Sequence, residues 1–261
     1  VIRIVLENNI RLPLLPLLKA APLKEIALHK AHEKLEKKVD AQLHEAAPGK
    51  VGKYLTVNES ACEDIPEGKA DELARSLLDF FHDRLIVQLK DSGIRHDVIK
   101  AVIAGGDDDL VRIVNRAKAV QAFLDTDDGR NLLAGYKRAA NILSIEEKKD
   151  KTSYQLDLTK IYKMSESLSE PAEKELVKSL DDVMSQVNSR IGLEGYADAM
   201  EKLSTLRAPV DMFFDKTMVN CDDKELRINR LRLLAGIRDS MNNIADFSKI
   251  EGDVKEQKKA A

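Results

Sequence analysis

Two histidine–aspartate doublets are the residues with the most direct chemical potential in this sequence. His82-Asp83 and His96-Asp97 combine the side chains that metal-dependent phosphohydrolases use to hold divalent cations. Such a site also needs a further histidine and a distant aspartate that converge with the doublet, and the spacing identifies neither. We therefore expect His82 on a helix face and His96-Asp97 at the start of a helix.

Three further patterns are weaker still. His29 and His32 stand three residues apart among lysines, which repel a cation, and they do not form an HExxH motif. Residues 125–129 resemble a calcium loop, but the glycine comes one position early and Tyr136 occupies the glutamate position. The glycine pair at 105–106 lacks the lysine of a phosphate-binding loop. These patterns predict no catalytic residue and no metal site.

Positive charge gathers in two stretches of a chain that is acidic overall. The formal net charge is −3, from 42 Lys+Arg against 45 Asp+Glu. Residues 136–163 contain seven basic and four acidic residues, and residues 224–238 contain five basic residues and one acidic residue. Such stretches fit either a solvated helix face or contact with a nucleic acid backbone.

Side chains that can read RNA lie beside these basic stretches. Asn141 follows Lys137 and Arg138 by about one helical turn, and amide and guanidinium groups suit the edges of unstacked bases. Three aromatic residues can provide stacking planes or, alternatively, core: Tyr136, Phe213 and Phe214. A helical scaffold that docks a protein partner, with its basic faces only solvated, explains the same features without RNA.

The elements that carry these residues are predicted to be helices. From residue 71 to about 250, apolar residues recur every three or four positions, and Pro171 suits the first turn of a helix. Asp107 or Asp108 is expected to cap one helix, and Asp222-Asp223 is expected to cap the last. Because no credible set of strands is present, we predict an all-α multi-helix bundle.

The predicted organisation has four parts. Residues 1–68 are a loop-rich connector with a helix over 23–45 and at most a short strand over 54–57, and its prolines 13 and 16 interrupt any helix near the start. Two helical halves follow, 69–150 and 151–252, with a polar linker over 146–169, and then a disordered tail over 253–261. Since the sequence starts at Val1 without methionine, we expect it to be cut from a longer chain.

Composition is typical of a soluble globular protein, with 43% hydrophobic and 33% charged residues. Aromatic residues make up 4% and tryptophan is absent, which argues against an all-β fold. No apolar run is long enough for a membrane span. The two cysteines, Cys62 and Cys221, lie too far apart for a zinc motif or a disulfide framework, so a reducing cytoplasm is expected.

Several motifs resemble a single family, in collinear order. The two longest are LLAGYKRAANIL at 132–143, followed by IEEKKD at 145–150, and RAPVDMFFDKTMVN at 207–220, followed by LRINRLRLL at 226–234 and ADFS at 245–248. Shorter matches are IVLEN at 4–8, RLP at 11–13, FFHDRL at 80–85 and GIRHD at 93–97. Together they resemble the C-terminal part of the β subunit of the bacterial heterotetrameric glycyl-tRNA synthetase.

The resemblance implies a fold and partners. It implies an all-α anticodon-binding domain similar to that of arginyl-tRNA synthetases, with tRNA(Gly) rather than DNA as its nucleic acid. It also implies an α2β2 glycine–tRNA ligase that serves translation in the cytoplasm, where the α subunit holds the class II site for glycine and ATP with Mg²⁺. This chain would then bind tRNA without a catalytic residue, metal or cofactor of its own.

Carried over to this sequence, the resemblance gives ten candidate tRNA-binding residues: Tyr136, Lys137, Arg138, Asn141, Phe213, Asp215, Lys216, Asn220, Arg227 and Arg230. Glycine anticodons end in two cytosines, whose O2 and N3 accept hydrogen bonds and whose N4 donates them. We expect Arg138, Asn141 or Arg230 to donate to these bases, and Asp215 or Asp211 to accept from them. We expect the phosphates to be held by Lys137, Lys216 and Arg227.

Overall fold

The computed structural model describes residues 2–19 and 67–252. Every regular element in these ranges is a helix, which confirms the predicted all-α class. The predicted helix over 23–45, the predicted strand over 54–57, the pair His29 and His32, Cys62 and the predicted tail lie outside the described residues. None of the described helices is long and apolar enough to cross a membrane.

The chain divides into two compact units, Val1–Leu85 and Ile86–Ala261. The first contains α1 (Ile2–Glu7), a short helix over 14–19 and most of α3 (Glu67–Asp91). The expectation that the prolines prevent a helix here is wrong. The helix over 14–19 starts directly after Pro13, and Pro16 lies in its first turn, where a backbone N–H has no helical partner.

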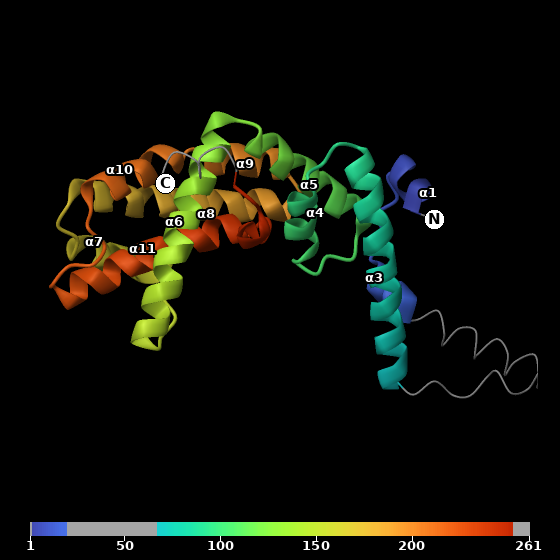
Figure 1. Cartoon of the computed structure of the whole chain (residues 1–261), viewed down its shortest axis with the longest axis horizontal. Coiled ribbons are helices and arrows are strands. Elements are labelled where there is room, and N and C mark those ends of the chain that lie inside the picture. Colours follow the sequence, from blue (N-terminus) through green and yellow to red (C-terminus); the bar gives the residue numbers. More distant parts are fainter. Residues whose placement is uncertain (1, 20–66, 253–261) are drawn as a thin grey trace, which may run out of the picture. The chain divides into compact units, whose positions relative to one another are not determined.

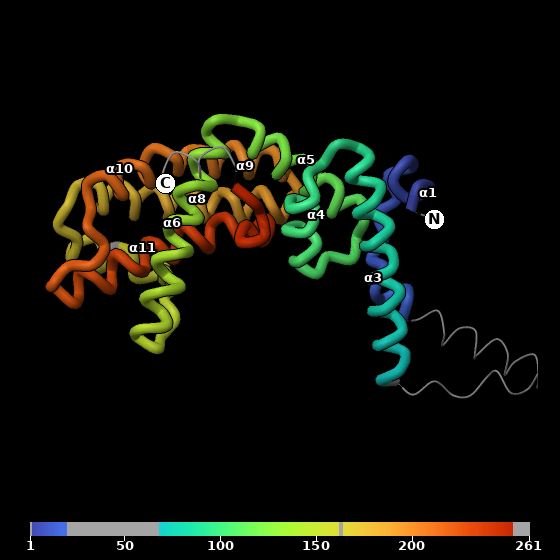
Figure 2. The backbone as a smooth tube through the Cα atoms, viewed as in Figure 1, coloured from blue at the N-terminus to red at the C-terminus, as the bar shows by residue number. Residues whose placement is uncertain are grey.

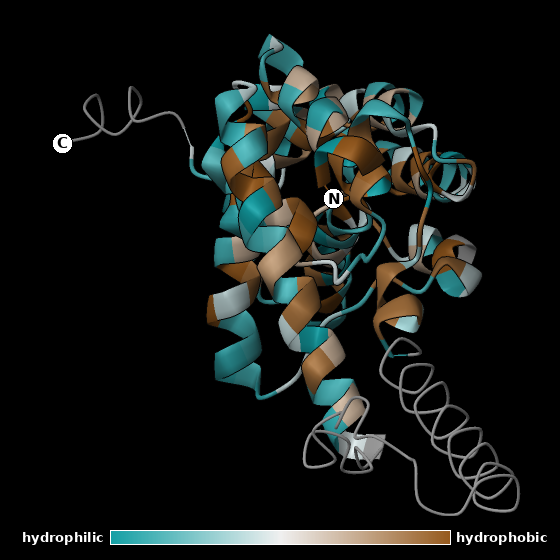
Figure 3. Cartoon of the chain, turned by 90° about the vertical axis from the view of Figure 1, so that its right-hand side faces the viewer, coloured by the Kyte–Doolittle hydropathy of each residue, from teal (hydrophilic) through white to brown (hydrophobic). Residues whose placement is uncertain are grey.

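The second unit contains the remaining helices. In chain order these are α4 (His96–Ile103), α5 (Leu110–Leu124), α6 (Asp127–Asp150), the 3₁₀ turn η2 (Leu158–Lys160), α7 (Ile161–Glu166), α8 (Pro171–Gly192), α9 (Tyr196–Ser204), α10 (Arg207–Lys216), α11 (Lys224–Asn242) and the 3₁₀ turn η3 (Phe247–Lys249). Helix α8 packs against α9, α10 and α11, and α6 crosses α11 and contacts α10 (Figure 1). Apolar and polar residues alternate along these helices, because each turns one face inward (Figure 3).

Side-chain caps fix where several helices begin. Asp223 accepts the N–H groups of Glu225 and Leu226, which confirms the predicted cap of α11. The predicted cap of α5 is wrong by one or two residues, because Asp109 accepts the first N–H groups of that helix. Asp107 is drawn instead toward Arg112, whose Nη2 lies 2.6 Å from its carboxylate.

The stretch predicted as a polar linker contributes to the core. Lys151 ends α6 with a left-handed φ of 52°, and the chain turns back from this end of the helix (Figure 2). Four of the following residues are buried: Tyr154, Ile161, Met164 and Leu168. Helices from both sides of residue 150 therefore share one core, and the boundaries expected at residues 68, 150 and 252 stay predictions.

Gly129, in the first turn of α6, lies where a side chain would collide with the backbone. A Cβ atom there would overlap the carbonyl group of Phe123. We expect Gly129→Ala to lower the free energy of unfolding by about 1–3 kcal/mol, because the start of α6 must shift. Urea unfolding measures this change, with Gly192→Ala as the control, since a Cβ there meets no atom within 4 Å. Equal stabilities of the two variants would contradict the expectation.

Candidate nucleic-acid interface

Helices α6 and α10 approach closely and thereby bring the two longest motifs together. A Cβ atom on Gly135 would lie 2.7 Å from Cγ1 of Val210, so glycine is the residue that permits this packing. Three residues further along α6, the guanidinium carbon of Arg138 lies 4.3 Å from the centre of the Phe214 ring on α10. This geometry is a cation–π contact between the two motifs.

The residues around this contact form an exposed polar surface. Arg138 and Asn141 are exposed on α6, Asp215 and Lys216 are exposed at the end of α10, and Phe214 is half-buried beneath Arg138. We call these five residues the α6–α10 surface. It combines a guanidinium plane, an amide, a carboxylate and an ammonium group. These are the side-chain types that stack on bases, read base edges and hold phosphates.

Two of the predicted stacking residues belong to the core instead. Tyr136 is 1% exposed, its hydroxyl donates to Oδ1 of Asn242 at 3.0 Å, and its ring packs on Phe247. Burial raises the pKa of Tyr136. Phe213 is fully buried. Neither ring faces solvent in this conformation, which fits the alternative that both belong to the core, and Phe214 is the accessible ring beside them.

Arg230 is also buried and does not belong to the α6–α10 surface. Its buried side chain pairs through Nε with the buried carboxylate of Glu173, and Nη1 donates to the carbonyl of Met218 at 2.8 Å. Glu173 also accepts the N–H groups of Ser169 and Glu170 at the start of α8. Arg230 therefore joins α11 to α8 and cannot donate to a cytosine in this conformation.

Arg227 and Asn220 form a further internal cluster rather than a phosphate contact. Arg227 pairs with Glu146 and, at 2.7 Å, with Asp150, both on α6. Asn220 donates to Glu146 at 3.0 Å and accepts from Arg227 at 3.2 Å. The guanidinium of Arg227 is therefore already paired with two carboxylates, and its predicted role as a phosphate ligand does not fit this conformation. Lys137 is half-buried, close to Gly252.

The Arg227 cluster should make stability sensitive to acid. The hydrogen bond from Arg227 lowers the pKa of Glu146, and hydrogen bonds from Tyr154 and Arg227 lower that of Asp150. A carboxylate with a lowered pKa stabilises the fold fully above its unfolded pKa of about 4. That contribution disappears as the pH falls through the lower, folded value.

We therefore expect wild type to lose stability more steeply than Arg227→Gln as the pH falls from about 5 to about 3. Urea unfolding across this range measures the difference. Arg232→Gln is the matched control on the same helix, because its side chain is exposed and bonds only to Asn229 among the described residues. Parallel pH profiles for wild type and Arg227→Gln would refute the role of this cluster.

Two exposed apolar residues lie close in sequence to residues of the α6–α10 surface. Ile145 on α6 is 64% exposed, and Met218, just after α10, is 75% exposed. Both follow the three-to-four spacing that predicts core, so the pattern gave no signal that they face solvent. Exposed apolar side chains beside a polar surface suit contact with the faces of unstacked bases.

The two histidine–aspartate doublets lie on helices, and Asp97 takes part in hydrogen bonds within the fold. His82 is buried on α3, and His96-Asp97 begins α4 as expected. Asp97 accepts from Arg95 at 2.6 Å and from the N–H of Glu251 at 2.8 Å, which ties the end of the described chain to α4. Across residues 2–19 and 67–252, no group of three or more His, Cys, Asp or Glu side chains is placed to hold a metal ion.

The C-terminal part of the chain is similar to a known domain family. Residues 132–251 match the model of the DALR anticodon binding domain. This range runs from α6 through η3 and contains the whole α6–α10 surface. The all-α bundle is consistent with this match.

Individual relatives are β subunits of glycine–tRNA ligase. The chain is 47% identical over 192 residues to the β subunit of Rhodospirillum centenum, covering 72% of this chain and 26% of that protein. It is 48% identical over 177 residues to that of Phenylobacterium zucineum, covering 67% and 25%. The chain thus spans about a quarter of the length of these relatives. These similarities confirm the resemblance that the motifs indicate.

Proposed function

We propose that this chain binds the anticodon loop of a glycine tRNA through the α6–α10 surface. The observation that carries the proposal is the exposed Arg138 guanidinium stacked on Phe214, since it unites the two motif segments at one accessible place. The match of residues 132–251 to an anticodon binding domain supports this assignment. The relatives are β subunits of glycine–tRNA ligase, which supports the choice of a glycine tRNA.

Each side chain of the surface has a distinct role in this proposal. The outer face of the Arg138 guanidinium stacks on a splayed base while its N–H groups donate to O2 or N3 of a cytosine. Asn141, about one turn along α6, presents an amide to the next base edge. Asp215 accepts from a cytosine N4 group, and Lys216 holds a phosphate without reading sequence.

The wider assembly is part of the same proposal. The chain acts within a cytoplasmic glycine–tRNA ligase, in which an α subunit attaches glycine to tRNA with ATP and Mg²⁺. The described residues contribute binding and orientation of the tRNA rather than chemistry. This division agrees with the residues of the α6–α10 surface, which are suited to hydrogen bonding and stacking.

Arg138→Ala tests the proposal directly. We expect this variant to bind a glycine tRNA transcript about tenfold more weakly, or about 1.4 kcal/mol, because it loses both stacking and hydrogen bonds to the anticodon. Fluorescence titration of the transcript measures the affinity. Arg130→Ala is the matched control, since Arg130 is an exposed arginine on the same helix that pairs with Asp127. Equal losses in both variants would show that only total charge matters.

A second candidate function is a helical scaffold for subunit association. Helix α3 carries exposed apolar residues at three-to-four spacing: Leu73, Leu77, Phe80 and Val87. A stripe of this kind suits packing against a partner helix. The scaffold function predicts that the chain co-elutes with the glycine–tRNA ligase α subunit and binds no RNA. Tenfold weaker tRNA binding by Arg138→Ala would instead support the anticodon proposal.

A further inference from the structure

The acidic residues near the end of α6 are held in ion pairs, whereas two of the lysines there are not. The three acidic residues face α11, where Arg227 binds Glu146 and Asp150, and Arg238 binds Glu147. Lys148 and Lys151, by contrast, are exposed and form no ion pair with any residue in the described ranges. The solvent side of this helix end is therefore positively charged, although the chain as a whole carries −3.

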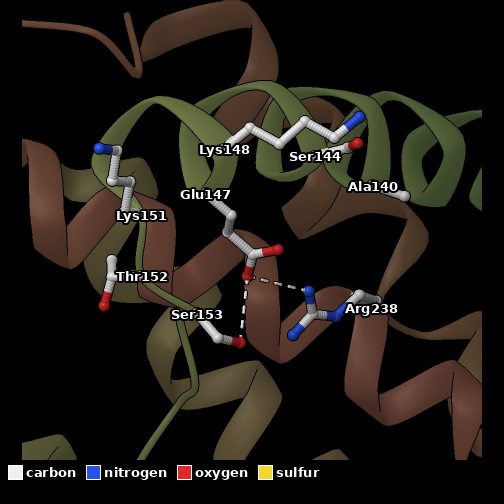
Figure 4. Close-up of a pocket in the computed structure, with 8 residues that line it drawn as sticks. All are labelled: Ala140, Ser144, Glu147, Lys148, Lys151, Thr152, Ser153 and Arg238. Carbon is white, nitrogen blue, oxygen red and sulfur yellow. Dashed lines mark hydrogen bonds and ion pairs between the residues drawn. The ribbon is translucent and has the colours of Figure 1, made fainter.

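A pocket of about 450 Å³ lies against this positive side. It is lined by Ala140, Ser144, Glu147, Lys148, Lys151, Thr152, Ser153 and Arg238. Figure 4 shows Lys148 with Ser144 on one part of the rim and Lys151 with Thr152 on another. Two ammonium groups and the hydroxyl groups of Ser144 and Thr152 thus line one pocket, and this donor set suits an anion with several oxygen atoms. The third hydroxyl, that of Ser153, lies against Glu147.

The one carboxylate in the pocket is neutralised by the fold. Oε1 of Glu147 accepts the N–H of Tyr154 at 3.0 Å, Nη1 of Arg238 at 3.2 Å and the Ser153 hydroxyl at 3.5 Å. Nη2 of Arg238 donates to the Tyr154 carbonyl at 3.1 Å, which holds the guanidinium at the base of the pocket. Arg238 pairs with Glu147 and also with Asp239, which does not line the pocket, so the two lysines are the unpaired charges among the lining residues.

Helix electrostatics explains only part of this arrangement. Cations are favoured near the end of any helix, because they offset the partial negative charge of its last carbonyl groups. That preference accounts for lysines in the last turn of α6. It does not account for the hydroxyls of Ser144 and Thr152, which line the same pocket.

We propose that this pocket binds a phosphate group of the RNA backbone, held by Lys148 and Lys151 with the hydroxyls of Ser144 and Thr152. The inference rests on the proposed function, because it assumes that RNA reaches α6. Lys148 follows Asn141 by seven residues, or two turns, so both lie on the same side of the helix, roughly 10 Å apart along its axis. A strand that places a base at Asn141 can therefore extend to the pocket.

The test compares two double variants that lose the same charge. Lys148→Gln with Lys151→Gln removes the pocket lysines, and Lys100→Gln with Lys118→Gln removes two exposed lysines on α4 and α5. We expect the pocket variant to bind glycine tRNA roughly tenfold more weakly, with the slope of log affinity against log salt reduced by about 1–2. Its preference for the glycine anticodon over a changed anticodon should remain, because phosphate contacts carry no sequence information.

Three outcomes overturn the inference in different ways. Equal tRNA affinities for the two double variants, with wild type binding normally, would refute the phosphate pocket and leave the proposed function intact. Absence of tRNA binding by wild type would refute both. Calorimetric titration with inorganic phosphate separates the remaining case. If the pocket variant loses binding of inorganic phosphate but keeps full tRNA affinity, the pocket serves a free anion and not the RNA backbone.

Discussion

Arg230→Met is expected to lower the free energy of unfolding by about 3–5 kcal/mol. The substitution leaves the fully buried Glu173 carboxylate without its cation, and it also frees the Met218 carbonyl that Nη1 now binds. A buried charge without a partner is costly, because the protein interior cannot replace the water that the charge has lost. The loss is measured by urea unfolding at neutral pH.

Arg232→Met is the matched control for this prediction. Arg232 stands two residues further along α11, carries the same charge and is exposed. Its replacement should change the free energy of unfolding by no more than about 0.5 kcal/mol. If Arg230→Met were equally mild but abolished tRNA binding, Arg230 would be an RNA ligand rather than a link between α11 and α8.

Phe213→Ala and Phe214→Ala are expected to separate stability from binding. Phe213 is fully buried, so its truncation should cost about 3–5 kcal/mol of stability through lost burial and the cavity left behind. Phe214 is half-buried beneath Arg138, and its truncation should cost clearly less stability. It should, however, weaken binding of glycine tRNA by about 1–3 kcal/mol, because the Arg138 plane loses its support.

Urea unfolding and tRNA titration of the two variants check this pair of predictions. Phe213→Leu completes the comparison, because it keeps most of the buried volume and should fold well enough for its binding to be measured. Wild-type affinity is expected for Phe213→Leu. Loss of RNA binding in folded Phe213→Leu, with none in Phe214→Ala, would contradict the assignment of the accessible ring.

The helices could be predicted from the sequence because their signals are local. Apolar spacing and a proline in the first turn marked α8, and Asp223 marked the start of α11. For α5 the sequence pattern indicates Asp107 or Asp108, whereas Asp109 is the cap, because three adjacent aspartates offer the same side chain to the start of a helix. The turn of the chain after α6 depends on the left-handed backbone conformation of Lys151, and a lysine in the sequence does not indicate such a conformation.

The site could be predicted only as two segments. Phe213 and Phe214 are adjacent and chemically identical, yet the first is core and the second is accessible. For the arginines of α11, the sequence likewise does not show which are exposed and which are paired internally, because the carboxylate that binds Arg230 lies on α8, far away in the sequence. Tertiary packing determines which basic residues form internal ion pairs, and local sequence patterns do not contain that information.

The most direct measurement is a binding titration of this chain with a glycine tRNA transcript and with the same transcript after both anticodon cytosines are changed. Each titration runs at two salt concentrations. Contacts to phosphates weaken as salt rises, whereas the difference in affinity between the two transcripts comes from contacts to the bases. Recognition through the α6–α10 surface predicts a preference of about tenfold or more, or about 1.4 kcal/mol, at both concentrations. Equal affinities with a steep salt dependence would contradict anticodon reading and leave only a basic surface.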